Sequence, residues 1–347
     1  MTGTIANNER VVLISGCSAG GIGHHLALEL AAHGCRVFAG VRTLSKAQTL
    51  VDNPLIEAVE LDVTDDASVD AAVAYVLAAT GGRIDMLVNN AGIHCVGPTV
   101  EVPLAQVQQV FNTNFIGLAR LCRAVAPIMM DRRQGTIVNV GSASGYVATP
   151  WVGFYASTKA AVHAYSDSLR MELAPFGVNV VVVAAGCVKS NIVDNYSGAL
   201  LDDNITRYTM ARSAIEEKFG LSQVEGVTPT SQFVRVVVPK LLRSSPPAYI
   251  TYGTLSKTTW FMHYMPPVIR DFVLSRRYGT HQLAKDLKSS SAACSDGAGP
   301  VSDNNAGDAG CLVSGKAPSI SCPVASPTTM WVAAAALGTA YALSKWK

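Results

Sequence analysis

The sequence predicts an α/β fold: a single doubly wound parallel-sheet domain, followed by a disordered C-terminal linker and a short apolar tail. Short apolar segments alternate with helical patterns, and some of them, such as VNVVVVA at residues 178–184, are apolar at nearly every position. Strands of this kind are typical of a parallel sheet that helices cover on both faces. The expected strands are residues 11–15, 36–41, 56–61, 84–89, 136–140, 178–184 and 247–251.

The first expected strand leads into a glycine-rich turn, GCSAGGIG at residues 16–23, and a helical pattern follows at residues 24–33. Glycines in such a turn let the backbone approach a pyrophosphate closely. The following helix offers free N–H groups and the positive end of its dipole to the phosphates. A second expected strand begins at residue 36, directly after the helical pattern. The order strand, glycine turn, helix and strand favours a dinucleotide-binding βαβ unit over a turn without a ligand.

The predicted domain spans residues 1–285, and a polar, less regular stretch at about 190–222 is expected to be the substrate lid, since it follows the sixth strand. Residues 286–329 are rich in Ser, Ala, Gly, Asp and Asn without periodicity, which predicts a flexible linker. Residues 330–347 form an apolar tail whose uncharged part, 330–343, is shorter than the ~20 residues of a bilayer span. A membrane anchor, a docking helix and a disordered end all stay open for it.

The composition argues against several classes of function. A net charge of +2 over 347 residues gives no electrostatic case for binding nucleic acid. The eight cysteines include no CxxC pair, and the seven histidines form no metal constellation, so no metal is expected. Scattered cysteines and an N-terminus without a signal pattern predict a cytoplasmic location, or one on the cytosolic face of an intracellular membrane such as the endoplasmic reticulum or a lipid droplet.

A serine, a tyrosine and a lysine in one short stretch predict acid–base chemistry. Tyr155 and Lys159 are four residues apart in a helical pattern, which places both side chains on one face. A fixed positive charge favours the phenolate, so we expect Lys159 to lower the pKa of Tyr155. Ser142 follows a strand and can polarise a carbonyl oxygen. The three residues suit carbonyl reduction or alcohol oxidation, with Tyr155 as the proton donor in reduction.

With these patterns in place, residues 9–255 resemble the short-chain dehydrogenase/reductase family, which has a Rossmann fold. The glycine turn resembles the family's TGxxxGxG with Ser15 in place of Thr and one extra residue, and LDV at 61–63 and NNAG at 89–92 match two further motifs. Asn114, within NTNFIG, matches the asparagine that completes a catalytic tetrad with Ser142, Tyr155 and Lys159, and it is expected to anchor a water in the proton relay.

The resemblance also implies where the cofactor is held. Lys159 is expected to hydrogen-bond the nicotinamide ribose, and Val188 and Ser190 to flank the nicotinamide, although Ala185 replaces the family's usual proline and Ser190 its threonine. The implied cofactor contacts are Gly16, Ser18, Gly21, Ile22, Gly23, Arg42, Asp62, Asn89, Ala91, Gly92, Arg123, Tyr155, Lys159, Val188 and Ser190.

The end of the second strand predicts which cofactor is used. Enzymes of this fold that use NAD place an acidic residue there to bind the ribose 2′-OH, whereas this chain has Val41 and Arg42. A guanidinium can pair with a 2′-phosphate through charge-assisted bonds. We therefore expect NADPH/NADP+ as the cofactor, at least tenfold preferred over NADH in catalytic efficiency.

A narrower resemblance concerns the substrate. The stretch GCSAGGIGHHLALELAAHGCRVFAGVRTLSK and the segment LSRRYG resemble the fungal branch around NADPH-dependent 1-acyldihydroxyacetone-phosphate reductase. We expect reduction of a ketone on a hydrophobic small-molecule or lipid substrate, an acyl-dihydroxyacetone phosphate being one option. An anionic head group would need basic residues near the lid, and the candidates are Lys189, Arg207, Arg212 and Lys218.

Other readings stay open at this point. A specialised-metabolite or steroid-like ketone is an alternative substrate, and the same site would catalyse alcohol oxidation. A non-catalytic NADPH-binding scaffold tethered to a membrane by the tail is a reading of another class, against which the intact tetrad argues. Family members often form dimers or tetramers, so a homo-oligomer is a further expectation.

Overall fold

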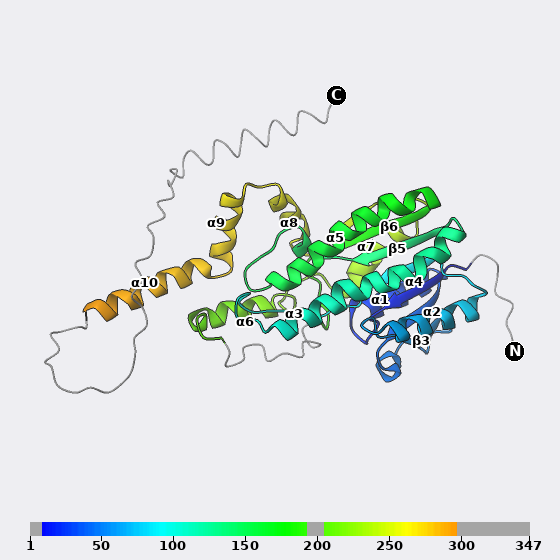
Figure 1. The fold of residues 1–347 in the computed structure, drawn as a ribbon, viewed down its shortest axis with the longest axis horizontal. Coiled ribbons are helices and arrows are strands. Elements are labelled where there is room, and N and C mark those ends of the chain that lie inside the picture. Colours follow the sequence, from blue (N-terminus) through cyan, green and yellow to red (C-terminus); the bar gives the residue numbers. More distant parts are fainter. Residues whose placement is uncertain (1–8, 193–204, 297–347) are drawn as a thin grey trace, which may run out of the picture. The chain divides into compact units, whose positions relative to one another are not determined.

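The structure, a computed structural model, describes residues 9–192 and 205–296. Its centre is a seven-stranded parallel sheet in the order β3-β2-β1-β4-β5-β6-β7 (Figure 1). The strands are β1 (Val11–Ser15), β2 (Arg36–Val41), β3 (Ile56–Glu60), β4 (Met86–Asn89), β5 (Gly135–Val140), β6 (Val178–Ala185) and β7 (Tyr249–Tyr252). All seven predicted strands are confirmed, with ends that differ by at most two residues.

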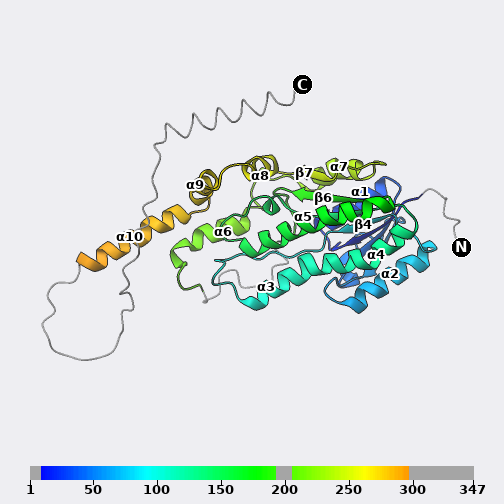
Figure 2. The same ribbon diagram turned by 45° about the horizontal axis from the view of Figure 1, so that its top comes forward.

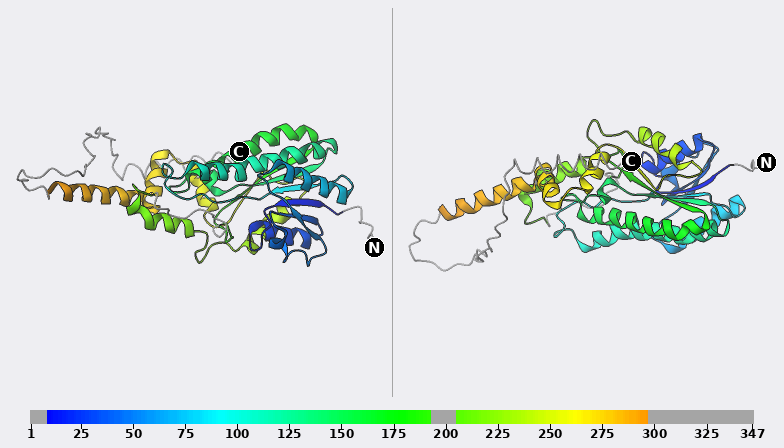
Figure 3. Two further views of the ribbon diagram at one scale, coloured as in Figure 1. Left: turned by 60° about the horizontal axis from the view of Figure 1, so that its bottom comes forward. Right: turned by 90° about the horizontal axis from the view of Figure 1, so that it is seen from above.

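Helices cover both faces of the sheet, as the apolar strands predicted (Figure 3). On one face α1 (Ile22–Ala32) and α7 (Thr230–Leu241) pack over β1, β2 and β6 through an aliphatic core. On the other face α2 (Asp66–Thr80), α4 (Gly117–Asp131) and α5 (Gly153–Leu173) bury a second core. The strand order reverses between β1 and β4, and ligands of doubly wound sheets bind in the crevice at such a switch point.

The remaining helices lie toward the carboxyl ends of the strands (Figure 2). They are α3 (Leu104–Phe111), α6 (Arg212–Gly220), α8 (Ser256–His263), α9 (Pro267–Arg277) and α10 (Thr280–Asp296). Short 3₁₀ turns occupy Leu44–Ala47, Ala143–Gly145, Ala174–Phe176 and Thr209–Ala211, and a π-helical segment covers Asn112–Ile116. A third apolar cluster joins Trp151 to Ile215 of α6 and Leu283 of α10.

The domain boundary predicted at residue 285 needs correction. Helix α10 continues to Asp296, and the first compact unit of the chain is Met1–Ser295. Serines favoured the linker prediction, yet here their hydroxyls donate back to helix carbonyls, as Ser289 and Ser290 do to Asp286 at 2.9 and 3.0 Å. Residues 297–329 of the predicted linker and the tail at 330–347 lie outside the described residues. Among the helices that the structure describes, none is both long and apolar enough to cross a bilayer.

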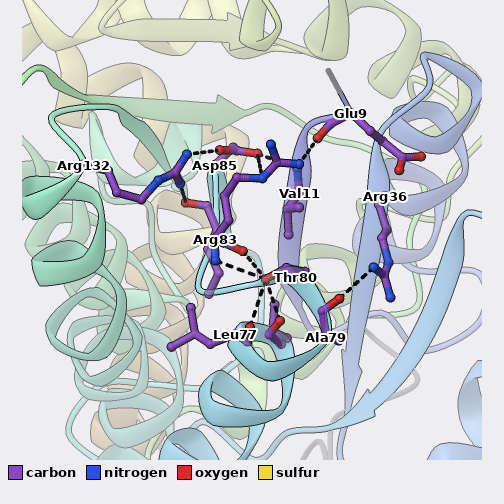
Figure 4. A network of polar contacts seen from close by, with 11 residues as sticks. Glu9, Val11, Arg36, Leu77, Ala79, Thr80, Arg83, Asp85 and Arg132 are labelled. Carbon is purple, nitrogen blue, oxygen red and sulfur yellow. Dashed lines mark hydrogen bonds and ion pairs between the residues drawn. The ribbon is translucent and has the colours of Figure 1, made fainter. Parts of the chain in front are cut away.

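Polar side chains close the amino end of the sheet (Figure 4). Asp85, just before β4, accepts a hydrogen bond from the Val11 N–H at 2.8 Å. Its carboxylate also pairs with the guanidinium groups of Arg83 at 3.3 Å and Arg132 at 3.1 Å. Because the carboxylate is only 13% exposed, these partners replace the water that it loses on folding. The sheet is thus fastened at the end opposite the switch-point crevice.

Candidate active site

A cavity of about 270 Å³ lies at the carboxyl ends of the strands, where the fold predicts a ligand. Its wall combines the glycine turn after β1, the ends of β2 and β5, the segment after β4, and residues of α5, α6 and the loop after β6. Thirteen of the predicted site residues line it: Gly16, Ser18, Gly21, Ile22, Arg42, Asp62, Ala91, Gly92, Ser142, Tyr155, Lys159, Val188 and Ser190.

The glycine turn is built for close approach. Gly16 has φ +75°, a conformation that favours glycine, and a Cβ there would lie 2.8 Å from the Cα of Ala91. Helix α1 begins with Gly21 as N-cap, and no side chain of the described residues accepts from the N–H groups of its first turn. Free N–H groups at a helix start suit a phosphate ligand. These residues fit the pyrophosphate of a dinucleotide.

Arg42 and Asp62 line the cavity at the ends of β2 and β3. The Asp62 carboxylate accepts hydrogen bonds from the backbone N–H and hydroxyl of Thr64 at 2.9 and 2.7 Å. Burial raises the pKa of Asp62, but these bonds and the charge of Arg42 outweigh it, so that the pKa lies below its ordinary value. Next to β2 the cavity wall therefore holds the Asp62 carboxylate beside the Arg42 guanidinium. Arg42 occupies the position at which an acidic residue would bind a ribose 2′-OH.

Three of the predicted cofactor contacts lie outside the cavity wall, and their contact with a cofactor stays a prediction. Gly23, Asn89 and Arg123 are not among the residues that line the cavity. Asn89 points into the interior, where its amide donates to Asn139 at 2.9 Å, and Arg123 is exposed on α4. The next residue along, Asn90, lines the cavity and donates to the Ser15 and Gly16 carbonyl oxygens at 3.0 and 2.9 Å.

Successive residues at the end of a strand point to opposite sides, which explains why Asn90 and not Asn89 reaches the cavity. Ser15 also connects the NNAG segment to the glycine turn. The Ser15 hydroxyl accepts from the N–H groups of Asn90 and Ala91, both at 3.1 Å. The NNAG segment and the glycine turn are therefore held together by side-chain hydrogen bonds.

Tyr155 and Ser142 meet at the cavity wall. Burial raises the pKa of Tyr155 to about 12 and outweighs the Ser142 side chain, which acts in the opposite direction. The expected decrease in the pKa of Tyr155 beside Lys159 is therefore not found, because burial outweighs the groups that favour the phenolate. Removing the phenolate from water costs more than the Ser142 side chain returns. At neutral pH Tyr155 is a protonated phenol.

Lys159 lies one turn further along α5, with Nζ 5.8 Å from the centre of the Tyr155 ring. Its ammonium donates to the Val140 carbonyl oxygen at 2.9 Å, and the residue is 5% exposed. Burial lowers the pKa of Lys159 to about 8. No carboxylate of the described chain pairs with it. The site therefore holds a nearly buried cation against an uncharged acid.

Asn114 lies behind the cavity in the π-helical segment before α4. Its Oδ1 accepts from the Ile93 N–H at 2.8 Å, and its Nδ2 donates to the Ile93 carbonyl at 2.9 Å and to Thr158 at 3.2 Å. The side chain thereby ties the segment after β4 to helix α5. The predicted role in anchoring a water stays a prediction.

The sequence reasoning missed His94. Its ring stacks on that of Tyr155, with centroids 4.4 Å apart and planes at 5°. Burial, followed by the charge of Lys218, lowers the pKa of His94 to about 4, so the imidazole is neutral at pH 7. Its Nδ1 is buried without a hydrogen-bond partner among the described residues. The signal available in the sequence is its place two residues after NNAG.

Comparisons with known proteins agree with this geometry. Residues 10–199 match the family described as short chain dehydrogenase. The short-chain dehydrogenase ptmH of Penicillium ochrochloron is 36% identical over 274 residues, which cover 78% of this chain and 98% of that protein. The NADPH-dependent 1-acyldihydroxyacetone phosphate reductase of Schizosaccharomyces pombe is 35% identical over 238 residues, covering 67% of this chain and 79% of that protein.

A crystal structure of a short-chain dehydrogenase from Streptomyces avermitilis is similar in fold, with a TM-score of 0.65 and 27% identity. The match covers 80% of this chain and 99% of that structure. The parallel sheet, the glycine turn before α1 and the joint position of Ser142, Tyr155 and Lys159 thus coincide with the family match. The chain belongs to the short-chain dehydrogenase family.

Proposed function

We propose that this protein is an NADPH-dependent reductase that acts on a ketone of a hydrophobic substrate. One observation carries the proposal: Tyr155 and Ser142 line the same cavity as the glycine turn. A proton donor and a hydrogen-bonding group are thereby available where a dinucleotide of this fold ends.

The proposed roles follow from the contacts. The bound nicotinamide cofactor supplies the hydride. Tyr155 gives its proton to the carbonyl oxygen, and Ser142 donates a hydrogen bond to the same oxygen. The phenolate that forms on Tyr155 is stabilised by the nearby charge of Lys159, which costs no rearrangement because the Val140 carbonyl already fixes the ammonium. His94 holds the phenol ring in place by stacking on it.

Two observations support NADPH over NADH. Arg42 lines the cavity at the end of β2, where a guanidinium can bind a 2′-phosphate, and β2 carries no acidic residue. The relative from Schizosaccharomyces pombe is, by its name, NADPH-dependent.

The lining of the cavity supports a hydrophobic substrate. Its wall includes Val147, Val152, Phe219 and Leu221, which lie among polar residues such as Thr149 and Ser222. An acyl-dihydroxyacetone phosphate, named in the reductase of Schizosaccharomyces pombe, is one substrate of this kind. A specialised-metabolite ketone is the second candidate, since the relative from Penicillium ochrochloron is named only as a short-chain dehydrogenase.

The test is NADPH oxidation by the purified full chain against a panel of phosphorylated and uncharged hydrophobic ketones. We expect Tyr155→Phe to reduce turnover by about 10²- to 10⁴-fold while NADPH binding, followed by fluorescence, is kept. Tyr264→Phe is the matched control, because Tyr264 is 68% exposed and does not line the cavity. Near-normal turnover by Tyr155→Phe would refute the mechanism, and NADPH binding without turnover of any ketone would favour the scaffold reading.

A further inference from the structure

Lys218 carries a charge that the described part of the protein does not balance. It lies near the end of α6, partly buried, and burial lowers its pKa to about 8. Its ammonium is 4.4 Å from the centre of the Tyr278 ring. The neighbouring carboxylate of Glu217 pairs with Arg277 at 2.9 Å, and no described carboxylate pairs with Lys218. An aromatic face attracts a cation but does not neutralise it.

Lys218 faces two adjoining cavities. It lines the cavity that holds Tyr155, and also a second cavity of about 140 Å³. The residues Lys218, Leu221 and Tyr278 line both. The second cavity is also lined by Arg276, whose guanidinium lies 3.6 Å from the centre of the Phe272 ring, and by Arg277, which pairs with Glu217. Among the described residues, three cations therefore line this cavity against the carboxylate of Glu217. An excess of positive charge around a small cavity is a site for an anion.

The same charge acts on the reacting end of the cavity. Lys218 contributes to lowering the pKa of His94, whose ring stacks on Tyr155. Tyr278, whose ring lies next to the Lys218 ammonium, is held in place because its carbonyl oxygen accepts a hydrogen bond from the Trp151 indole at 2.8 Å. An anion bound at Lys218 would therefore be held at a defined place relative to the carbonyl that Tyr155 protonates.

The structure also selects among the four basic residues of the predicted lid. Lys189, Arg207 and Arg212 are exposed, and none of them lines either cavity. Only Lys218 combines partial burial, an uncompensated charge within the described chain and a place on the wall shared with Tyr155.

We propose that Lys218, with Arg276 and Arg277, binds a phosphate monoester group of the ketone substrate. The dianion would balance the surplus of cations at the second cavity, while the apolar residues of the first, such as Val147, Val152 and Phe219, take the hydrocarbon part. This inference rests on the proposed function, since it names the substrate class of the same site.

The kinetic test compares two ketones that differ only in the phosphate: an acyl-dihydroxyacetone phosphate and the unphosphorylated acyl-dihydroxyacetone. For Lys218→Met in the full chain we expect kcat/KM on the phosphorylated ketone to fall by about 10- to 100-fold, mainly through KM. Catalytic efficiency on the neutral ketone should fall by a much smaller factor, so that the preference for the phosphorylated ketone is lost, and Lys218→Arg should keep most of that preference. Lys189→Met, an exposed lysine outside both cavities, is the matched control and should behave as the unmodified protein.

A binding measurement separates this inference from the proposed function, because it needs no turnover. Calorimetry should show that an acyl glycerol phosphate binds more tightly than the matching acyl glycerol, and that Lys218→Met removes the difference while thermal unfolding stays unchanged. Equal affinities in the unmodified protein, or a variant that weakens both ligands alike, would overturn the assignment. Inorganic phosphate that binds as tightly as the acyl ester would also overturn it, since the site would then serve free phosphate.

Discussion

The two ends of the parallel sheet treat charge in opposite ways. At the amino end, Asp85 is surrounded by two guanidinium groups and a backbone N–H (Figure 4). At the carboxyl end, Lys159 has a carbonyl oxygen as its partner and Lys218 an aromatic ring, and neither pairs with a described carboxylate. From this difference we infer that charge compensated within the fold stabilises it, and we propose that charge left uncompensated is available to a ligand.

Uncompensated charge has an energetic cost that the fold must offset elsewhere. A buried ammonium without an anion is disfavoured relative to water, which is why the pKa values of Lys159 and Lys218 both fall to about 8. Substitutions at the carboxyl end should therefore cost activity and spare stability, and those at the amino end should do the reverse.

The largest expected effect is on turnover. Lys159→Met removes the charge that stabilises the Tyr155 phenolate, and we expect kcat to fall by about 10²- to 10³-fold. Because the variant also removes a desolvated cation, the free energy of unfolding should be equal or greater. Steady-state kinetics beside denaturant unfolding measures both. A marked loss of stability would show that Lys159 is structural and would break the comparison.

Asp85→Asn should have the opposite profile. Its two arginine partners are about a quarter exposed, so we expect a loss of about 2 kcal/mol in the free energy of unfolding, below the range for fully buried pairs. The kcat of the folded variant should be unchanged. Asp70→Asn is the control, because Asp70 is exposed on α2 and forms no ion pair with a described residue. A variant as stable as the control would contradict the role of this network.

Arg42→Ala tests the cofactor side of the carboxyl end. We expect the ratio of kcat/KM for NADPH to that for NADH to fall by about tenfold, because a charge-assisted bond to the 2′-phosphate is lost. Arg243→Ala, an exposed arginine outside the cavity, should leave the ratio unchanged. An unaltered preference in Arg42→Ala would mean that another group reads the 2′-phosphate.

The smallest expected effect is on pH dependence. Burial lowers the pKa of His163 to about 4, and its Nε2 accepts from the Ser142 N–H at 3.4 Å. Between pH 6.5 and pH 4 the unfolded chain binds a proton that the folded chain does not, so this contribution is complete above pH 6.5 and is lost as the pH falls toward 4. Denaturant unfolding at pH 7 and pH 5 should show a smaller decrease for His163→Asn.

His281→Asn is the control for that measurement and should keep the full decrease, since His281 lies on α10, away from Ser142. The buried His94 shares the low pKa and the same window, so the decrease in His163→Asn should shrink without vanishing. A decrease identical to that of the unmodified protein would show that His163 does not contribute.

The sequence by itself determined the strands, the glycine turn and the positions of Ser142, Tyr155 and Lys159. These features depend on local patterns: apolar runs, glycines between a strand and a helix, and a spacing of four on a helix. Each of these patterns depends only on residues close together in the sequence. The predicted strands and those of the structure therefore agree within two residues.

Only the tertiary structure decided the rest, because it depends on burial and on direction. The pleat at the end of β4 turned Asn89 inward to Asn139 and Asn90 to the cavity. Desolvation reversed the predicted pKa shift of Tyr155, and packing of α6 selected Lys218 from four basic residues that look alike in sequence. The sequence gives the type and charge of each side chain, but the extent to which each group is removed from water depends on contacts between distant segments.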